Sequence, residues 1–398
     1  MTPLRVRLVA LALVGGCSQG DDPVFLDLGG SVNDASTGLP VPSAEVTLRD
    51  RLGNETPTTT DADGQWSVDV ILAGEEPLPI DIEVAHPNFV GTVYHYQVRL
   101  PPESDARLEI RPGGTERPRG LLIPGIPVAP NSPSPGTLRG NVFDATVDRD
   151  FDPEPWFING LPLTLRSGMR TLEGEAVATA ESGTLDPEGG FEMAAVPPGT
   201  YTLSVEGGSD FSDAFVTVVV IGGTTRTGQN IGTAAAIGEE DFRFVLSWGA
   251  TPSDLDSHLW GPNPRATDGL PFHIFFPDEY RYAPIGDTED PFGTLDVDDV
   301  TSFGPETVTL LGRAGNRYRY YVHDYSNLDK ASSFAMSESG AKVQVWSGSS
   351  YDSFEITPGS DATVWHVADI DGATGWIYFV NEFDHQSSPD LVGDITTD

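Results

Sequence analysis

The side chains in this sequence that could act together chemically are acidic residues and histidines near position 256. Asp254, Asp256 and His258 alternate with Leu255 and Leu259. On an extended strand, residues two apart point to the same face, so the two aspartates and the histidine share one face and the leucines the other. The spacing predicts a strand with one ligand-rich face and one apolar face.

A second acidic run occupies residues 295–299. Its alternation puts Asp296 and Asp298 on one face of a strand, with Leu295 and Val297 toward the core. Carboxylates held close together repel one another unless a cation or protons intervene, and Ca²⁺ takes six or more oxygen ligands. The alternative is that these carboxylates are solvated or hydrogen-bonded on an acidic surface. The pattern predicts a Ca²⁺ site with the ligands Asp254, Asp256, Asp296, Asp298, Asp299 and Glu306.

Histidines and a further acidic segment add candidate ligands. His258 and His323 could join the carboxylates in a transition-metal site, but neither lies in a known ligand spacing, so calcium is favoured. Asp148, Asp150 and Asp152 also alternate, and their segment faintly resembles the calcium loop of adhesin repeat domains. A proline stands where an EF-hand needs glycine, which leaves an acidic surface loop as the alternative.

Known catalytic motifs are missing from the sequence. It contains no His-Glu-x-x-His, no Gly-x-Ser-x-Gly, no phosphate-cradling glycine loop and no paired-cysteine metal site. We therefore expect a protein that is not an enzyme. The rival hypothesis is a secreted hydrolase whose active site forms on folding around Asp256, His258, Asp298 and His323.

The composition narrows the fold and the class of partner. Glycine (44 residues) and proline (33 residues) are abundant, which disfavours long helices and favours short strands joined by tight turns. With 22 basic and 60 acidic residues the formal net charge is −38, so phosphate backbones are repelled and nucleic acid is excluded as a partner. A single cysteine excludes disulfide scaffolds, thiol-rich zinc sites and iron–sulfur clusters. These features predict an all-β protein.

The one cysteine, Cys17, follows an export signal. Arg5 and Arg7 precede a short apolar run, and Gly15 and Gly16 lie directly before the cysteine. The run is too short to span a bilayer. The pattern resembles the lipobox of bacterial lipoproteins, which implies cleavage after residue 16, acylation of Cys17 and, with serine rather than aspartate next, export to the outer membrane. An ordinary signal peptide with a chance cysteine is the alternative.

Turn signals and alternating strands divide the rest of the chain into three units. The segment between the first two units holds seven prolines, which favours a stiff, extended spacer. The last dozen residues are polar, which predicts a disordered tail. The predicted segments are a signal peptide at 1–16, a tether at 17–24, β-rich units at 25–110, 137–233 and 234–385, a spacer at 111–136 and a tail at 386–398.

The first two units share motifs in the same order. Gly30-Ser-Val32 and Asp61-Ala-Asp63-Gly64-Gln-Trp66 of the first correspond to Gly140-Asn-Val142 and Asp186-Pro-Glu-Gly189-Gly190-Phe191 of the second. Both units resemble carboxypeptidase-regulatory-like domains. The resemblance implies a transthyretin-like, seven-stranded β-sandwich with a stalk or accessory role.

The third unit carries several motifs in order: the run from Asp254 to Leu259, the acidic run at 295–299, Gly304-Pro-Glu-Thr307 and the segment from Tyr320 to Tyr325. Together they resemble an uncharacterised family of bacterial domains found in exported proteins. The resemblance implies a β-sandwich of unknown role and brings no chemistry with it. The predicted fold is therefore tandem small β-sandwiches followed by a larger C-terminal β-sandwich-like domain.

These observations predict a lipid-anchored protein of the bacterial outer membrane, facing the periplasm or the cell surface. Two stalk sandwiches would present the third unit as a binding head for a glycan or an envelope protein. Tyr280 and Tyr282 lie among charged residues in a predicted loop and could form an exposed platform for that partner. A purely structural envelope component is the alternative.

Overall fold

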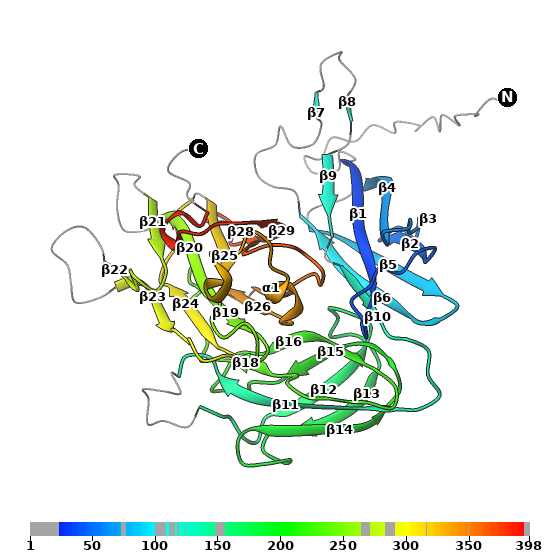
Figure 1. The fold of residues 1–398 in the computed structure, drawn as a ribbon, viewed down its shortest axis with the longest axis horizontal. Coiled ribbons are helices and arrows are strands. Elements are labelled where there is room, and N and C mark those ends of the chain that lie inside the picture. The colour runs from blue at the N-terminus through cyan, green and yellow to red at the C-terminus, as the bar shows by residue number, and fades with distance from the viewer. Residues whose placement is uncertain are drawn as a thin grey trace.

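The computed structural model describes residues 24–72, 77–99, 109–110, 116–117, 119–123, 125–147, 156–263, 271–282, 291–315, 317–348 and 350–393. The predicted signal peptide, Cys17, Asp148, Asp150 and Asp152 lie outside these residues. The described chain is nearly all β, as predicted, and consists of three β-sandwich units (Figure 1). None of its described helices is long and apolar enough to cross a membrane.

The first sandwich contains the strands β1 (Val24–Asp34), β2 (Glu45–Asp50), β3 (Glu55–Thr59), β4 (Gln65–Leu72), β5 (Leu78–His86), β6 (Phe89–Val98), β9 (Arg119–Leu122) and β10 (Ile126–Val128). One sheet has the order β10-β1-β4, with β9 also paired to β1, and the other has the order β3-β2-β5-β6. The short strands β7 (Glu109–Ile110) and β8 (Glu116–Arg117) pair with each other. Every second residue of β4 is buried, as the alternation in the sequence predicts.

The second sandwich contains β11 (Gly136–Asp144), β12 (Pro162–Ser167), β13 (Ala176–Glu181), β14 (Gly190–Val196), β15 (Gly199–Val205), β16 (Ala214–Val220), β17 (Thr225–Arg226) and β18 (Ile231–Thr233). Its sheets are β14-β11-β17, with β18 also paired to β11, and β13-β12-β15-β16. This order repeats that of the first sandwich, and β17 and β18 run parallel to β11 as β9 and β10 run parallel to β1. The two units therefore share one topology, in agreement with their shared motifs.

Part of the predicted proline-rich spacer at 111–136 belongs to the first sandwich. Strands β9 and β10 lie within it, and Ile123, Ile126 and Val128 are buried in the first core. The prediction of a free spacer is wrong for these residues. Proline is tolerated here because β9 and β10 are short and pair with β1 alone, where a missing amide donor costs little.

The shared turn motif has the same role in both sandwiches. The Asp61 carboxylate accepts hydrogen bonds from the backbone amides two and four residues ahead, both at 2.9 Å, and Gly64 has a φ of 70°. Asp186 accepts the equivalent bonds at 3.1 and 3.2 Å, and Gly189 has a φ of 69°. Only glycine adopts this left-handed conformation without a steric cost.

The third sandwich contains β19 (Phe242–Ser247), β20 (Asp256–Pro262), β21 (Pro271–Ile274), β22 (Tyr280–Tyr282), β23 (Pro291–Val297), β24 (Glu306–Leu310), β25 (Arg317–His323), β26 (Lys342–Ser347), β27 (Ser350–Glu355), β28 (Val364–Asp371) and β29 (Ile377–Asp384), with the short helices η2 (Tyr325–Asn327), α1 (Ala335–Glu338) and η3 (Pro389–Leu391). A six-stranded sheet, β22-β23-β24-β19-β26-β27, packs against a five-stranded sheet, β21-β20-β25-β28-β29. The core between them holds Tyr318, Tyr320 and Trp365, all fully buried.

Residues 386–393 pack onto the third sandwich, so the prediction of a disordered tail is wrong for this part of the chain. The Trp260 indole nitrogen donates a 2.7 Å hydrogen bond to the Val392 carbonyl. Val392 is fully buried beside Trp260, Tyr321 and Val364. The Val392 side chain thus anchors this polar segment to the third sandwich. The composition of the segment, which is mostly polar, does not reveal this contact.

The three sandwiches contact one another directly. The Gln344 side chain of the third exchanges two hydrogen bonds, of 3.0 and 2.9 Å, with the Gly232 backbone of the second. Arg99, next to the first sandwich, donates a 3.1 Å bond to the Ile377 carbonyl of the third. The third unit therefore rests on the other two and does not stand apart at the end of an extended rod.

Candidate metal centre

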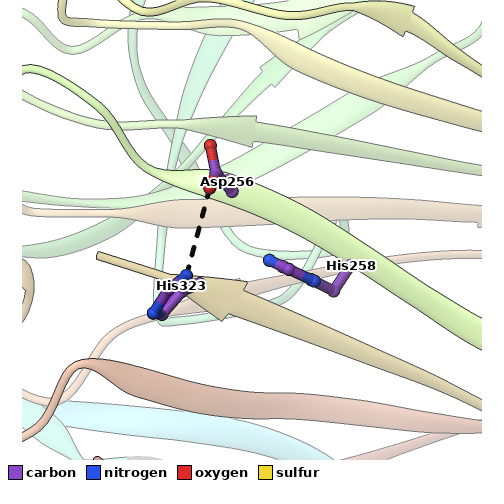
Figure 2. A group of neighbouring side chains, drawn as sticks. All are labelled: Asp256, His258 and His323. Carbon is purple, nitrogen blue, oxygen red and sulfur yellow. Dashed lines mark ion pairs between the residues drawn. The ribbon is translucent and has the colours of Figure 1, made fainter. Parts of the chain in front are cut away.

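Three of the predicted ligands come from neighbouring strands of the five-stranded sheet. Asp256 begins β20 and pairs with His323, the last residue of β25. His258 follows two residues along β20, and Figure 2 shows the three side chains side by side. Leu255 and Leu259 lie in the core between the sheets. The alternation of Asp256 and His258 with Leu255 and Leu259 is therefore as predicted, whereas Asp254 precedes β20 and does not belong to the strand.

This ligand-bearing face is buried. Asp256 is 2% exposed, and His258 and His323 are 0% exposed. The Phe275 ring lies 5.4 Å from the His258 ring, and the Gln386 backbone contacts His323. The alternative of a solvated acidic strip therefore does not describe these three residues.

The atoms that these three side chains turn toward one another lack hydrogen-bond partners within the described ranges. They are Asp256 Oδ2, His258 Nε2 and His323 Nδ1. His323 Nδ1 lies 4.0 Å from Asp256 Oδ2, and the three candidate ligand atoms lie within 4.8 Å of one another. A buried polar atom without a partner costs about 1–3 kcal/mol, so such atoms are rare in folded proteins. A cation among them would satisfy all three.

The outer ring nitrogens hold both imidazoles in a ligand orientation. His323 Nε2 donates to the Gln386 carbonyl at 2.8 Å, which leaves the lone pair of the neutral ring on Nδ1. His258 Nδ1 lies 2.9 Å from His273 Nε2, and when it donates, the lone pair is on Nε2. Metal-binding histidines are commonly held through their other nitrogen in this way.

A second group of ligand atoms shares Asp256 and consists of carboxylate oxygens alone. Asp298 follows the end of β23 and Glu306 begins β24, and the two offer oxygens within 4.8 Å of one another and of Asp256. Glu306 is fully buried, and one of its oxygens accepts a hydrogen bond from the Ser257 amide. Its other oxygen, Asp298 Oδ1 and the neighbouring Asp254 Oδ1 accept no hydrogen bond from an amide, hydroxyl or ring nitrogen in the described part of the chain. Asp298 and Glu306, like Asp254 and Asp256, lie close enough to share a proton.

The surroundings of Asp256, Glu306 and His258 shift their pKa values in the direction that favours the neutral forms. Burial, reinforced by the neighbouring carboxylates, raises the pKa of Asp256 to about 9 and that of Glu306 well above its usual range. Burial and the neighbouring imidazoles lower the pKa of His258. Without a cation, Asp256 and Glu306 are therefore held protonated, and a bound cation would displace those protons.

The metal-free protein is expected to lose stability as the pH rises from about 7 to about 9. The pKa values of Asp256 and Glu306 are raised in the folded chain, so the folded state binds more protons than the unfolded one. The free energy of unfolding then falls by up to about 1.4 kcal/mol per pH unit for each such proton. Histidines of the unfolded chain are neutral in this window, so His258 contributes little to the slope.

Urea unfolding in the presence of a chelator, repeated across this pH range, measures the slope. Asp256→Asn removes one of the titrating groups and should make the slope shallower. A stability that stays constant or rises with pH in the metal-free wild type would contradict the expectation.

Asp296 lies apart from both ligand groups. A β-bulge between Leu295 and Val297 makes it an extra residue of β23. Its carboxylate accepts hydrogen bonds from the Thr294 and Thr309 hydroxyls. The predicted common face with the next aspartate is therefore wrong, because the bulge breaks the alternation.

Asp299 also lies outside the two groups. Its Oδ1 accepts hydrogen bonds from the Thr301 amide at 2.6 Å and the Thr301 hydroxyl at 2.9 Å, so it closes a local turn. This oxygen therefore has a structural role, and Asp299 as a metal ligand stays a prediction.

Two parts of the site were not predicted from the sequence: the His273 ring and the Gln386 carbonyl. His273 lies on β21 opposite Trp260 of β20, so its place beside His258 depends on a strand pairing. Its only local signal is a polar residue between Phe272 and Ile274. A backbone carbonyl such as that of Gln386 has no sequence signal at all.

Comparison with known proteins gives no family for this chain: no family model and no curated protein matches it. Among solved structures, it is similar to catechol 1,2-dioxygenase from Acinetobacter sp. ADP1 (TM-score 0.22, 15% identity), over 29% of this chain and 55% of that one. It is also similar to the Bacillus anthracis TIE protein (0.20, 9%), over 75% and 45%. A third is the minor pilin GBS52 of Streptococcus agalactiae (0.20, 12%), over 53% and 97%. The chain thus spans about half the length of the first two, and these scores carry no functional argument.

Proposed function

We propose that this chain is a non-enzymatic, lipid-anchored protein of the bacterial cell envelope whose third sandwich is a binding head stabilised by Ca²⁺. The observation that carries the proposal is the convergence of Asp256, Asp298 and Glu306, with unpartnered oxygens in a buried setting. Such carboxylates destabilise a fold unless a cation or protons neutralise them. An oxygen-only group suits Ca²⁺, and Asp254 lies beside it as a further oxygen donor.

Ca²⁺ is expected to raise the melting temperature of the full chain after metal removal. At a free concentration of about 100 times Kd, one bound ion adds about 2.7 kcal/mol to the free energy of unfolding. Glu306→Gln should abolish the shift, whereas Glu240→Gln, which changes an exposed glutamate of the same unit, should retain it. A wild-type melting temperature that Ca²⁺ leaves unchanged would reject the calcium site.

The lipid anchor rests on the sequence around Cys17. Cells that express the chain in the presence of an alkyne fatty acid are expected to label the wild type and not Cys17→Ala. Membrane fractionation and protease treatment of intact cells then test the outer membrane and its side. Equal labelling of both chains would reject acylation at this residue.

An exposed aromatic pair supports a glycan or protein partner for the head. Tyr280 and Tyr282 are 51% and 39% exposed, and their rings stack with centroids 6.5 Å apart. Tyr280 also lines a shallow cavity of about 470 Å³ together with Arg243 and Asp296. Aromatic faces beside hydrogen-bonding side chains suit sugars and protein loops.

Binding of envelope glycans and proteins to the full chain tests this surface. Replacement of both Tyr280 and Tyr282 by alanine should remove binding, whereas Tyr325→Ala, at another exposed tyrosine, should keep it. A wild-type chain that binds nothing in either screen would favour the purely structural role. Burial of Asp256, His258 and His323 favours a binding role over the rival hydrolase, because a substrate needs access to its catalytic groups.

A further inference from the structure

We infer that the third sandwich binds a first-row transition metal ion through Asp256, His258 and His323, separate from the calcium ion. The inference rests on the proposed function only for the neighbouring Ca²⁺, because the nitrogen-containing site depends on its own ligands. The two ions would share Asp256, so that the head contains a centre of two metal ions.

The ligand chemistry of the two groups differs. Imidazole nitrogen suits Zn²⁺, Fe²⁺, Mn²⁺ and related ions, whereas Ca²⁺ prefers oxygen. Two histidines and one carboxylate with further positions open form a recurrent site for such ions. His258 Nε2 and His323 Nδ1 are both fully buried and unpartnered among the described residues, which makes each a candidate nitrogen ligand.

The geometry separates the two groups. Within the described ranges, the ligand atoms form two sets of three, each within 4.8 Å, and not one set of five. Asp256 belongs to both sets, and a carboxylate with two oxygens can bind one ion on each side. The geometry therefore favours two ions over a single ion that contacts all five side chains.

The charges agree with two ions. Asp256, Asp298 and Glu306 offer oxygens within 4.8 Å of one another, and Asp254 lies two residues before Asp256. When all four ionise, they carry four negative charges, and two divalent ions carry four positive ones. The two histidines bind as neutral rings, which their burial favours.

The nitrogen site is preformed by groups outside it. The Gln386 carbonyl fixes the proton of His323 on Nε2, and His273 lies at hydrogen-bond distance from His258. Gln386 belongs to the C-terminal segment that Val392 anchors beneath Trp260. Binding of the ion should therefore be coupled to docking of this segment.

Co²⁺ is the probe for the test, because its visible absorption reports nitrogen ligands and it substitutes for Zn²⁺. The full chain, stripped of metal and then saturated with Ca²⁺, is expected to bind one Co²⁺ per chain. His258→Ala and His323→Ala should each weaken Co²⁺ binding by more than about 100-fold, since loss of an outer partner alone costs about 10–100-fold. His385→Ala, at an exposed histidine of the same unit, should leave it unchanged.

Several results would overturn the inference. They are no Co²⁺ binding by the wild type, binding that both histidine variants retain, or displacement of Co²⁺ by Ca²⁺ with one ion per chain. Circular dichroism of each variant detects misfolding, and the wild-type metal content measured by mass spectrometry does not depend on any variant. Co²⁺ binding without a response to Ca²⁺ would support this site and reject the calcium proposal, so the two failures are distinguishable.

Removal of residues 386–398 is expected to weaken Co²⁺ binding by about 10–100-fold and to alter its visible spectrum. The reason is that His323 loses the carbonyl that fixes its proton on Nε2. Removal of residues 394–398 alone keeps every contact described for this segment and is the matched control. Equal affinity and equal spectra for the two truncated chains would contradict the coupling.

Discussion

Replacement of Arg170 by alanine is expected to destabilise the contact between the second and third sandwiches by about 3–5 kcal/mol. The Arg170 guanidinium donates hydrogen bonds to the Asp352 carboxylate and the Ser353 carbonyl. The side chains of Arg170 and Asp352 are only 9% and 14% exposed. Truncation of the arginine leaves the Asp352 charge buried without its partner, which costs far more than loss of an exposed ion pair.

The same arginine also reaches the first sandwich. Its guanidinium carbon lies 5.8 Å from the Tyr94 ring centre of β6 and 5.4 Å from that of Phe354 of β27. Cations over aromatic faces add stability, and the addition is larger where water is excluded. Arg170 therefore contacts all three sandwiches. We expect the wild type to unfold in one step and the variant in separate steps.

Differential scanning calorimetry of the full chain measures both the cost and the number of transitions. Arg49→Ala is the matched control, because Arg49 pairs with Glu55 at 2.8 Å while their side chains are 48% and 55% exposed. Its expected cost is at most about 1 kcal/mol. Similar small losses in the two variants would show that the Arg170 contact does not hold the sandwiches together.

Strands with a local alternation of apolar and polar residues could be predicted from the sequence, whereas strands that depend on pairing with a distant segment could not. Alternation of apolar and polar residues is visible within one strand, so β4 and the start of β20 could be predicted from the sequence. Strands β9 and β10 pair in parallel with β1, which lies far back in the chain, and they contain or adjoin prolines that favour a spacer. The second sandwich has the same arrangement, in which β17 and β18 pair with β11 as β9 and β10 pair with β1.

The candidate site shows the same limit at the level of single residues. Asp256 and His258 share a face by their spacing, which is local information. His323 joins them only because the last residue of β25 pairs with the first residue of β20. Asp296 leaves the group because of one bulge, an insertion that no residue in its run signals. The two histidines, which the sequence spacing ranked below the carboxylates, therefore lie at the centre of the candidate site in the folded chain.

Asp256→Asn is expected to be more stable than the wild type without metal and less stable than the wild type with both ions bound. Because burial raises the pKa of Asp256 to about 9, the metal-free wild type must hold a proton there at neutral pH, at a cost in folding free energy. Asparagine has the same shape and no such cost, so the metal-free variant should be more stable by about 1–4 kcal/mol, as when other buried charges are replaced. Asp256 belongs to both ligand groups, so the variant should also lose the stabilisation by both Ca²⁺ and Co²⁺, about 2.7 kcal/mol for each ion at about 100 times its Kd.

Chemical denaturation with a chelator, with Ca²⁺, with Co²⁺ and with both ions gives the four free energies for each chain. Asp298→Asn is the informative control, because Asp298 belongs to the oxygen group alone, and it should lose the response to Ca²⁺ while it keeps the response to Co²⁺. An Asp256→Asn chain that still responds to either ion would show that the two groups do not share this carboxylate. If the wild type had the same free energy of unfolding in all four conditions, neither ion would bind at this site. Protons alone would then neutralise the buried carboxylates.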